Sequence, residues 1–225
     1  MWKFIFRATL LLTATLAQAQ VIPDLVIEEE KPTFAFRSVQ INYNALRLIQ
    51  NSVSDSKASR EFQVEVGFHE RLFLTADAGF AKTNRGDTYS YQSDGTYWRT
   101  GLDINMAKNP DKGNLIGVGL RYAKAVYKDE IAYTRSFLDQ NDQTITQDVA
   151  LENADLSSEW IEFVFKMKVK IWKRFYTGYT MRYQFFLQLD GAESELQPLD
   201  IPGYGKTSRP NSFGFDYYIG WRIDL

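Results

Sequence analysis

The chain ends in FGFDYYIGWRIDL, residues 213–225, a stretch in which two kinds of residue strictly alternate. One set of alternate positions is apolar or aromatic: Phe213, Phe215, Tyr217, Ile219, Trp221, Ile223 and Leu225. The residues between them are small, polar or charged. A period of two predicts an extended strand with one oily face. The stretch is longer than an ordinary strand of about five or six residues and suffices for the roughly nine to eleven residues that cross a bilayer obliquely. We expect the closing strand of a membrane barrel.

Seven earlier segments repeat this alternation with the same parity of oily and polar faces. We expect strands over residues 36–48, 61–69, 72–80, 97–106, 116–122, 161–171 and 175–189. The connections between strands alternate between long and short. We expect long loops near residues 51–55, 82–95, 128–158 and 190–211, and short turns at 70–71, 108–113 and 173–174. This asymmetry is typical of a barrel whose termini and short turns share the periplasmic side. The predicted fold is all-β, an eight-stranded antiparallel transmembrane up-and-down barrel covering residues 36–225.

Three tryptophans fit the ends of such a barrel, because amphipathic rings favour the membrane interface. We expect Trp98 and Trp160 near the outer rim and Trp172 near the inner rim. The alternative is a secreted soluble sandwich or lipocalin-like barrel, which would bury the alternating face. Such a fold has no evident use for seven consecutive apolar positions on one strand.

Composition narrows the class of protein further. The 225 residues carry a formal charge of −2, which gives no bias toward nucleic acid, and we expect no nucleic-acid partner. Beyond the N-terminus, no window of eighteen uncharged apolar residues predicts a membrane helix. The mean hydropathy of −0.34 is compatible with a barrel, in which oily and polar residues alternate. The absence of cysteine excludes disulfides and thiolate metal sites.

The N-terminus predicts a secretory signal. Lys3 and Arg7 precede an apolar run, and Ala17-Gln18-Ala19 has the small-x-small pattern of a cleavage site. We therefore expect a signal peptide over residues 1–19 and a periplasmic lead-in, which contains an acidic run, over residues 20–35. The alternative is an anchoring helix, for which the apolar run is short.

Several short motifs resemble a family of small, uncharacterised outer-membrane proteins of Bacteroidota. The motifs are GLDIN at 101–105, GLRY at 119–122, IWKRFY at 171–176, IPGYGK at 201–206 and GFDYYI at 214–219. The resemblance extends from about Phe36 to the C-terminus. It implies an outer-membrane barrel and implies no activity, since the function of that family is unknown.

The polar faces of the predicted strands carry many ionic side chains. We expect a lumen charge network of Glu65, Asp77, Arg99, Asp103, Arg121, Glu162, Lys166, Lys168, Lys170, Arg182, Asp216, Arg222 and Asp224. Buried charges are tolerated when they are paired and hydrogen-bonded, so these residues are expected to fill a plugged barrel. The alternative is a small pore or transporter with a charged lumen, or an anion site at the three lysines.

The residues offer little chemistry for catalysis. His69 is the sole histidine, and we expect it at the periplasmic rim rather than in a catalytic triad. No nucleophile motif is present, so we expect no enzyme, no catalytic residue, no cofactor and no metal site. Two alternatives remain: a barrel enzyme acting on lipid or peptide, and an oxygen-ligand Ca²⁺ site near Asp139, Asn141 and Asp142.

The predicted function is therefore structural. We expect an outer-membrane protein, in contact with lipid, that anchors or assists an assembly, transport or secretion complex through its outer loops at 128–158 and 190–211. Aromatic residues in loops are suited to partner contacts. The candidates are Tyr89, Tyr91, Tyr133, Phe137 and Tyr204.

Overall fold

A computed structural model describes residues 35–54, 56–68, 71–86, 88–108, 114–138, 142–192 and 196–225. The expected signal peptide and nearly all of the expected lead-in lie outside these residues. So does His69.

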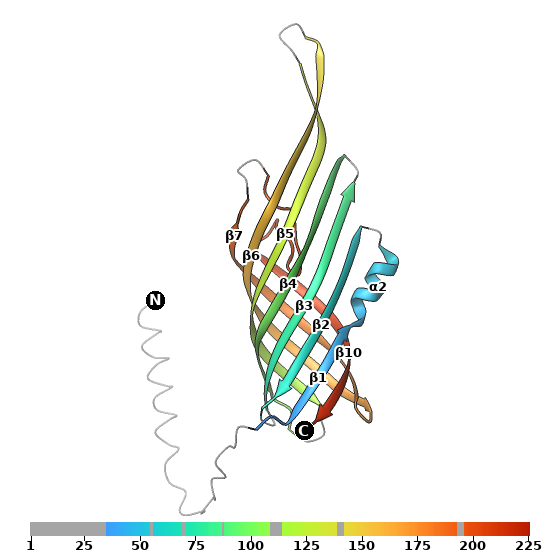
Figure 1. Ribbon diagram of the computed structural model, residues 1–225, viewed down its shortest axis with the longest axis vertical. Coiled ribbons are helices and arrows are strands. Elements are labelled where there is room, and N and C mark those ends of the chain that lie inside the picture. The colour runs from blue at the N-terminus through green and yellow to red at the C-terminus, as the bar shows by residue number, and fades with distance from the viewer. Residues whose placement is uncertain are drawn as a thin grey trace, which may run out of the picture. The chain divides into compact units, whose positions relative to one another are not determined.

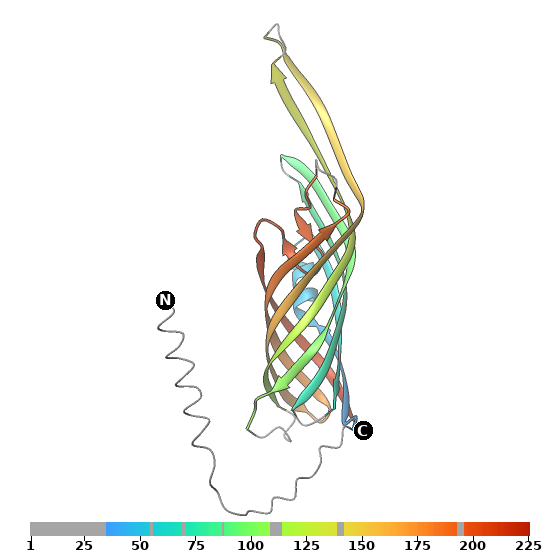
Figure 2. The same ribbon diagram turned by 90° about the vertical axis from the view of Figure 1, so that its left-hand side faces the viewer.

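Eight antiparallel strands are hydrogen-bonded in a closed ring, which confirms the predicted fold class (Figures 1 and 2). The order around the ring is β1-β10-β7-β6-β5-β4-β3-β2, so the last strand closes against the first. The strands are β1 (Ser38–Asn44), β2 (Lys57–Gly67), β3 (Leu72–Gly86), β4 (Tyr89–Asn105), β5 (Leu115–Leu138), β6 (Thr144–Trp172), β7 (Phe175–Asp190) and β10 (Asn211–Asp224).

The two faces of the ring follow the alternation in the sequence. On β10, Phe213, Phe215 and Ile219 are exposed on the outside, whereas Asp216 and Tyr218 are buried inside. The same parity holds on the other strands because successive side chains point to opposite faces. An apolar outer surface surrounds a polar interior.

The two ends of the barrel differ. At the terminal end, the barrel begins at Ser38 and finishes at Asp224, and the described connection between β6 and β7 is the two-residue turn at Lys173 and Arg174. At the opposite hairpin end, β5 and β6 extend well beyond their neighbours (Figure 2). The expected alternation of short and long connections therefore corresponds to two structurally distinct ends.

Two expected long loops prove to be strand hairpins. The segment predicted as a loop at 82–95 continues β3 and starts β4, and the two strands pair as far as Gly86 and Ser90. The segment at 128–158 is an extended hairpin in which β5 pairs with β6 out to Leu138 and Thr144. Both predictions were wrong because polar residues on both faces hide the alternation, while cross-strand hydrogen bonds still form outside an apolar environment.

The first strand is shorter than predicted. β1 ends at Asn44, and the chain continues as the helix α2 (Ala45–Val53) instead of extending to residue 48 and then forming a loop. The run Ala45-Leu46-Arg47-Leu48 consists of good helix formers. No helix in the described part of the chain is long and apolar enough to cross a membrane.

The connection between β7 and β10 contains a small two-stranded sheet, β8 (Asp200–Ile201) with β9 (Gly205–Lys206). Ile201 and Tyr204 are buried, and both belong to the hydrophobic cluster that includes Trp160. The described residues 196–206 of this connection are named the plug here. The long loop predicted at 190–211 therefore includes this short sheet, and the apolar side chains of the plug are covered inside the hairpin end of the barrel.

Candidate functional site

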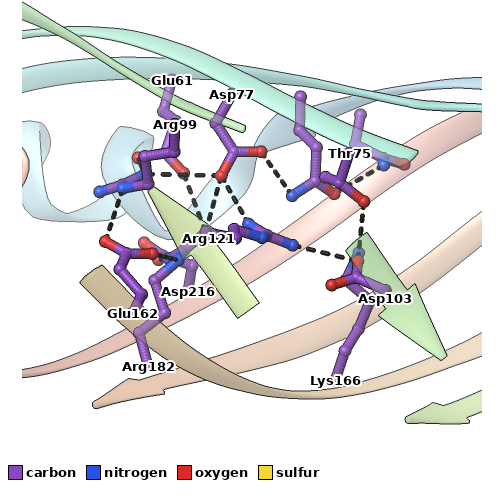
Figure 3. A network of polar contacts seen from close by, with 12 residues as sticks. Glu61, Thr75, Asp77, Arg99, Asp103, Arg121, Glu162, Lys166, Arg182 and Asp216 are labelled. Atoms are coloured by element: carbon purple, nitrogen blue, oxygen red, sulfur yellow. Dashed lines mark hydrogen bonds and ion pairs between the residues drawn. The ribbon is translucent and has the colours of Figure 1, made fainter. Parts of the chain in front are cut away.

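Carboxylates and guanidinium groups occupy the middle of the lumen (Figure 3). Asp77 on β3 has a carboxylate oxygen 2.6 Å from Nη1 of Arg121 on β5 and 3.7 Å from Nη1 of Arg99 on β4. Glu162 on β6 lies 2.9 Å from Nε of Arg99 and 3.2 Å from Nε of Arg182 on β7. The Asp77–Arg121 and Glu162–Arg99 pairs connect strands that are not neighbours in the ring, whereas the other two connect adjacent strands.

Glu61 on β2 is at the centre of this cluster although it is absent from the predicted network. Its carboxylate accepts hydrogen bonds from the hydroxyls of Tyr97, at 2.5 Å, and Tyr218. It also lies 2.9 Å from Nη1 of Arg99 and 3.4 Å from Nη2 of Arg182. Glu61 has the inward parity of Glu65, so the alternation on this strand could have identified it.

A second cluster lies nearer the terminal end. Lys166 has its ammonium 2.6 Å from a carboxylate oxygen of Asp103 and 3.1 Å from one of Glu65. Lys168 lies 2.7 Å from Glu65 and donates a hydrogen bond of 2.9 Å to Gln40. The void among these side chains measures only about 10 Å³, so the lumen is filled here.

The lumen charges compensate one another. Among the described residues, the carboxylates of both clusters are Glu61, Glu65, Asp77, Asp103, Glu162 and Asp216, and their cationic partners are Arg47, Arg99, Arg121, Lys166, Lys168 and Arg182. Apart from Arg47 on α2, all of these side chains are buried. Transfer of an unpaired ion into such an interior costs several kcal/mol, which pairing offsets. Chemically, the arrangement stabilises and fills the lumen.

The plug is bound to this network at the hairpin end. Its Asp200 carboxylate lies 2.7 Å from Nζ of Lys57 on β2 and 2.8 Å from Nη2 of Arg85 on β3. The carbonyl of Gly203 accepts hydrogen bonds from Arg99, at 2.9 Å, and from Gln184, at 3.2 Å. The plug is thus an integral part of the barrel interior.

A cavity of about 570 Å³ lies between the plug, α2, β2 and β10. Its basic lining residues are Arg47, Lys57, Lys82, Arg99, Arg182 and Lys206, and its acidic ones are Asp200 and Asp216. Arg99, Arg182 and Asp216 already take part in the lumen network. Apart from these three residues, the charged side chains that line the cavity are therefore mostly basic.

Asp129 is a buried carboxylate on β5, in the part of the strand that pairs with β6 toward the hairpin end and outside the apolar outer surface. It accepts hydrogen bonds from the hydroxyl of Tyr91, at 2.9 Å, and from the amide of Asn153, at 2.8 Å. Burial raises the pKa of Asp129 above that of an ordinary aspartate, and the two hydrogen bonds oppose this shift. Burial, together with the adjacent carboxylate, also raises the pKa of Tyr91.

The structure places most of the predicted lumen residues inside the barrel. The buried ones are Glu65, Asp77, Arg99, Asp103, Arg121, Glu162, Lys166, Lys168, Arg182 and Asp216. Lys170 is exposed, and Arg222 pairs with the exposed Asp224 at 2.7 Å. These three are rim residues of the terminal end, because inward parity produces burial only where the ring surrounds the side chain. Arg47 was missed because it lies on a helix where a strand was predicted.

The predicted aromatic contact residues divide into two groups. Tyr89 and Phe137 are exposed and Tyr133 is half-buried. Tyr91 and Tyr204 are buried, which contradicts their prediction as contact residues, because their side chains pack against the plug and the barrel interior. Trp160 was expected at the rim but is fully buried, with its indole donating to Glu162 at 2.7 Å. Trp98 and Trp172 are exposed on the outer face.

The structure bears on the expected absence of a metal site, whereas His69 lies outside the described residues. Within them, no three His, Asp or Glu side chains are grouped so as to hold a metal ion. Of the Ca²⁺ candidates, Asp139 and Asn141 lie outside the described residues.

The whole chain, residues 1–225, matches one protein-family model, described as "Domain of unknown function (DUF6048)". The chain belongs to this family. No curated protein matches the sequence. Among solved structures, the crystal structure of Acinetobacter baumannii CarO is similar to this chain, with 12% sequence identity and a TM-score of 0.39. The alignment covers 83% of this chain and 97% of that chain. These comparisons establish the family and assign no role.

Proposed function

We propose that this chain is a non-enzymatic outer-membrane β-barrel that anchors or assists an assembly, transport or secretion complex. The apolar outer face of the ring supports a membrane location, since exposed residues such as Phe62, Leu102, Phe163 and Phe185 would otherwise be in contact with water. The signal-like N-terminus supports export. The self-compensated lumen favours a scaffold over a pore.

The projecting hairpin of β5 and β6 carries the proposal. In the ring, β4 pairs with β5 only as far as Tyr133, and β7 pairs with β6 only from Ser157 onward. Residues 134–138 of β5 and 144–148 of β6 therefore pair in the sheet with each other alone. An isolated two-stranded ribbon is marginally stable in water. A partner that covers it or adds a strand to its open edge would stabilise it.

The side chains of this ribbon suit a protein contact. Phe137, Leu138 and Ile145 are 43%, 66% and 40% exposed at its tip. The guanidinium carbon of Arg135 lies 5.6 Å from the centre of the Phe137 ring, so the tip presents an aromatic and a cationic group side by side. Aromatic and arginine side chains of this kind dominate protein interfaces.

Truncation of the ribbon tests the proposal. Tyr133 and Val149 are direct partners, so residues 134–148 can be replaced by Asn-Gly, which closes a two-residue hairpin. We expect the variant to fold, as checked by heat-modifiable migration in gels, and to lose the proteins that co-purify with wild type from detergent-extracted membranes. Co-purification of the same partners with both proteins, or a wild-type chain that is always a lone monomer, would refute the docking role.

A milder variant distinguishes the effect of the apolar tip of the ribbon from the effect of its length. Substitution of Phe137, Leu138 and Ile145 by serine keeps the ribbon but removes its apolar tip, and Phe36→Ser is the control for an exposed aromatic at 64% exposure near the terminal end. We expect partner loss in the triple variant alone.

A further inference from the structure

The wall of the barrel is incomplete on one side of the hairpin end. β1 pairs with β2 only from Ser38 to Tyr43, and with β10 only from Ser38 to Asn44. Beyond this point, residues 57–61 of β2 pair only with β3, and residues 211–217 of β10 pair only with β7. Two strand edges therefore face each other across a gap.

Helix α2 occupies this gap and is joined firmly to one edge (Figure 1). The amide of Asn51 donates to the carbonyl of Ser59 at 2.7 Å, and its carbonyl oxygen accepts from the Ser59 backbone N–H at 2.8 Å. Asn51 thus satisfies the β2 edge as a neighbouring strand would. These two hydrogen bonds join α2 to this edge of the gap.

The opposite side of α2 forms a weaker seam. Within the described residues, no backbone hydrogen bond connects residues 211–217 with α2. The ion pair between Arg47 and Asp216, at 3.1 Å, links α2 to this edge. A seam held by side chains can open without breaking a sheet ladder.

The cavity of about 570 Å³ lies directly behind this seam, since its lining includes Leu46, Arg47 and Gln50 of α2 as well as residues 212–216. Nε of Arg47 is buried and has no hydrogen-bond partner. Lys206 has no carboxylate within ion-pair distance among the described residues, and Lys57 shares Asp200 with Arg85. The cavity therefore offers unused cationic and donor capacity.

The outer surface of the seam is apolar. Leu48 and Ile49 on α2 are 50% and 59% exposed, and Phe213 and Phe215 on β10 are 65% and 42% exposed. An acyl chain could lie along these side chains while an anionic group enters the cavity. A free anion has no use for this apolar approach.

We propose that the seam between α2 and β10 is a lateral entrance through which a membrane amphiphile, a phosphate or carboxylate on an acyl chain, places its headgroup in the cavity. The headgroup is bound by Arg47, Lys57 and Lys206, and the chain remains in the bilayer against Leu48 and Ile49. This site rests on the proposed membrane location but not on a protein partner.

Binding can be measured on the purified full-length barrel in neutral dodecyl maltoside. Native mass spectrometry would count dodecyl phosphate retained by the folded protein, with inorganic phosphate as the probe without a chain. We expect wild type to retain one dodecyl phosphate and to bind inorganic phosphate much more weakly. The combined Lys57→Gln and Lys206→Gln variant should bind dodecyl phosphate about tenfold more weakly, because charge-assisted contacts are lost.

Matched variants distinguish this site from general adsorption. Lys124→Gln removes a half-exposed lysine of β5 that is paired with Glu159 of β6, and this variant should bind as wild type does. Ile49→Asn should weaken dodecyl phosphate binding, whereas Ile104→Asn, at a similarly exposed isoleucine of β4, should not. Folding of each variant is checked by heat-modifiable migration.

Three results would overturn the site: no retention of dodecyl phosphate by wild type, equal loss in the control variants, or equally tight binding of inorganic phosphate. Because no partner protein is present, a negative result here leaves the docking role of the β5 and β6 ribbon unaffected, and a failed co-purification leaves this site unaffected.

Discussion

Glu61 illustrates how one buried carboxylate can connect several strands of this barrel. Its partners Tyr97, Arg99, Arg182 and Tyr218 come from β4, β7 and β10, while Glu61 itself lies on β2. The carboxylate compensates guanidinium groups that have no access to water. Loss of its charge affects all of these partners together.

We predict that Glu61→Gln lowers the free energy of unfolding by roughly 3 kcal/mol, because removing one member of a buried ion cluster leaves uncompensated charge. Glu159→Gln is the control, since this carboxylate lies at the surface with Lys124 and should change little. Urea titration of the refolded barrel in detergent measures both. Equal effects of the two substitutions would contradict the importance of the lumen network.

Asp129 leads to a prediction about pH. Its pKa is raised in the folded protein, so the folded state binds a proton more tightly than the unfolded chain does. Its contribution to stability is greatest below the ordinary aspartate pKa of about 4 and declines as pH rises through the folded value. Asp129→Asn should remove this decline.

The measurement compares the urea midpoints of wild type and Asp129→Asn at pH 4 and pH 7. The stability of the variant relative to wild type should be higher at pH 7 than at pH 4, while other titrating groups cancel in the difference. A difference that does not change with pH, or that has the opposite sign, would show that the hydrogen bonds from Tyr91 and Asn153 outweigh burial.

Among the elements, the plug and α2 have the most specific placement. The plug brings the backbone of Gly203 against the ring of Tyr97, where a side chain would not fit: a Cβ there would lie 2.6 Å from the ring. Gly203 also has a φ of 81°, a conformation that other residues rarely adopt. Glycine at this position is needed for both reasons.

Gly203→Ala is therefore predicted to displace the plug at a cost of roughly 1–3 kcal/mol. Limited trypsin digestion reports this change, because Lys206 follows closely in the chain and the bond after it should be cleaved faster. Gly86→Ala is the control, since a Cβ at Gly86 would meet nothing within 4 Å. Unchanged cleavage in Gly203→Ala would mean that the plug tolerates the methyl group.

At the scale of the whole molecule, the ring and its contents act together. The strands enclose a lumen in which opposite charges are matched, and the plug covers the hairpin end. Eight strands enclose an interior that side chains can fill. The barrel therefore joins an apolar outer surface to a solid polar core.

We predict that the wild-type barrel forms no stable open channel in planar lipid bilayers. Gly203→Ala, which loosens the plug, should still conduct no steady current, because the filled clusters nearer the terminal end remain intact. Reproducible conductance steps from wild type would contradict the filled lumen and favour the pore alternative.

How far the sequence predicts the structure depends on which interaction controls each segment. Strand parity could be read directly from residues such as Phe215 and Asp216, because an apolar exterior and a polar interior impose a period of two. The hairpins near Tyr91 and Tyr133 could not be predicted in this way, because neither face of these strands is apolar there. The helix at Arg47 was missed because the alternation of the first strand was extended to residue 48.

The sequence by itself determined the all-β class, the number of barrel strands and the inward-facing charges, because each follows from local alternation. Only the tertiary structure decided that Arg47 joins the network, that Tyr204 is buried in a plug, and that α2 takes the place of a strand in the barrel wall beside a cavity. These features depend on which side chains meet across the ring. Strand register and ring closure determine these meetings, and no single segment of the sequence contains that information.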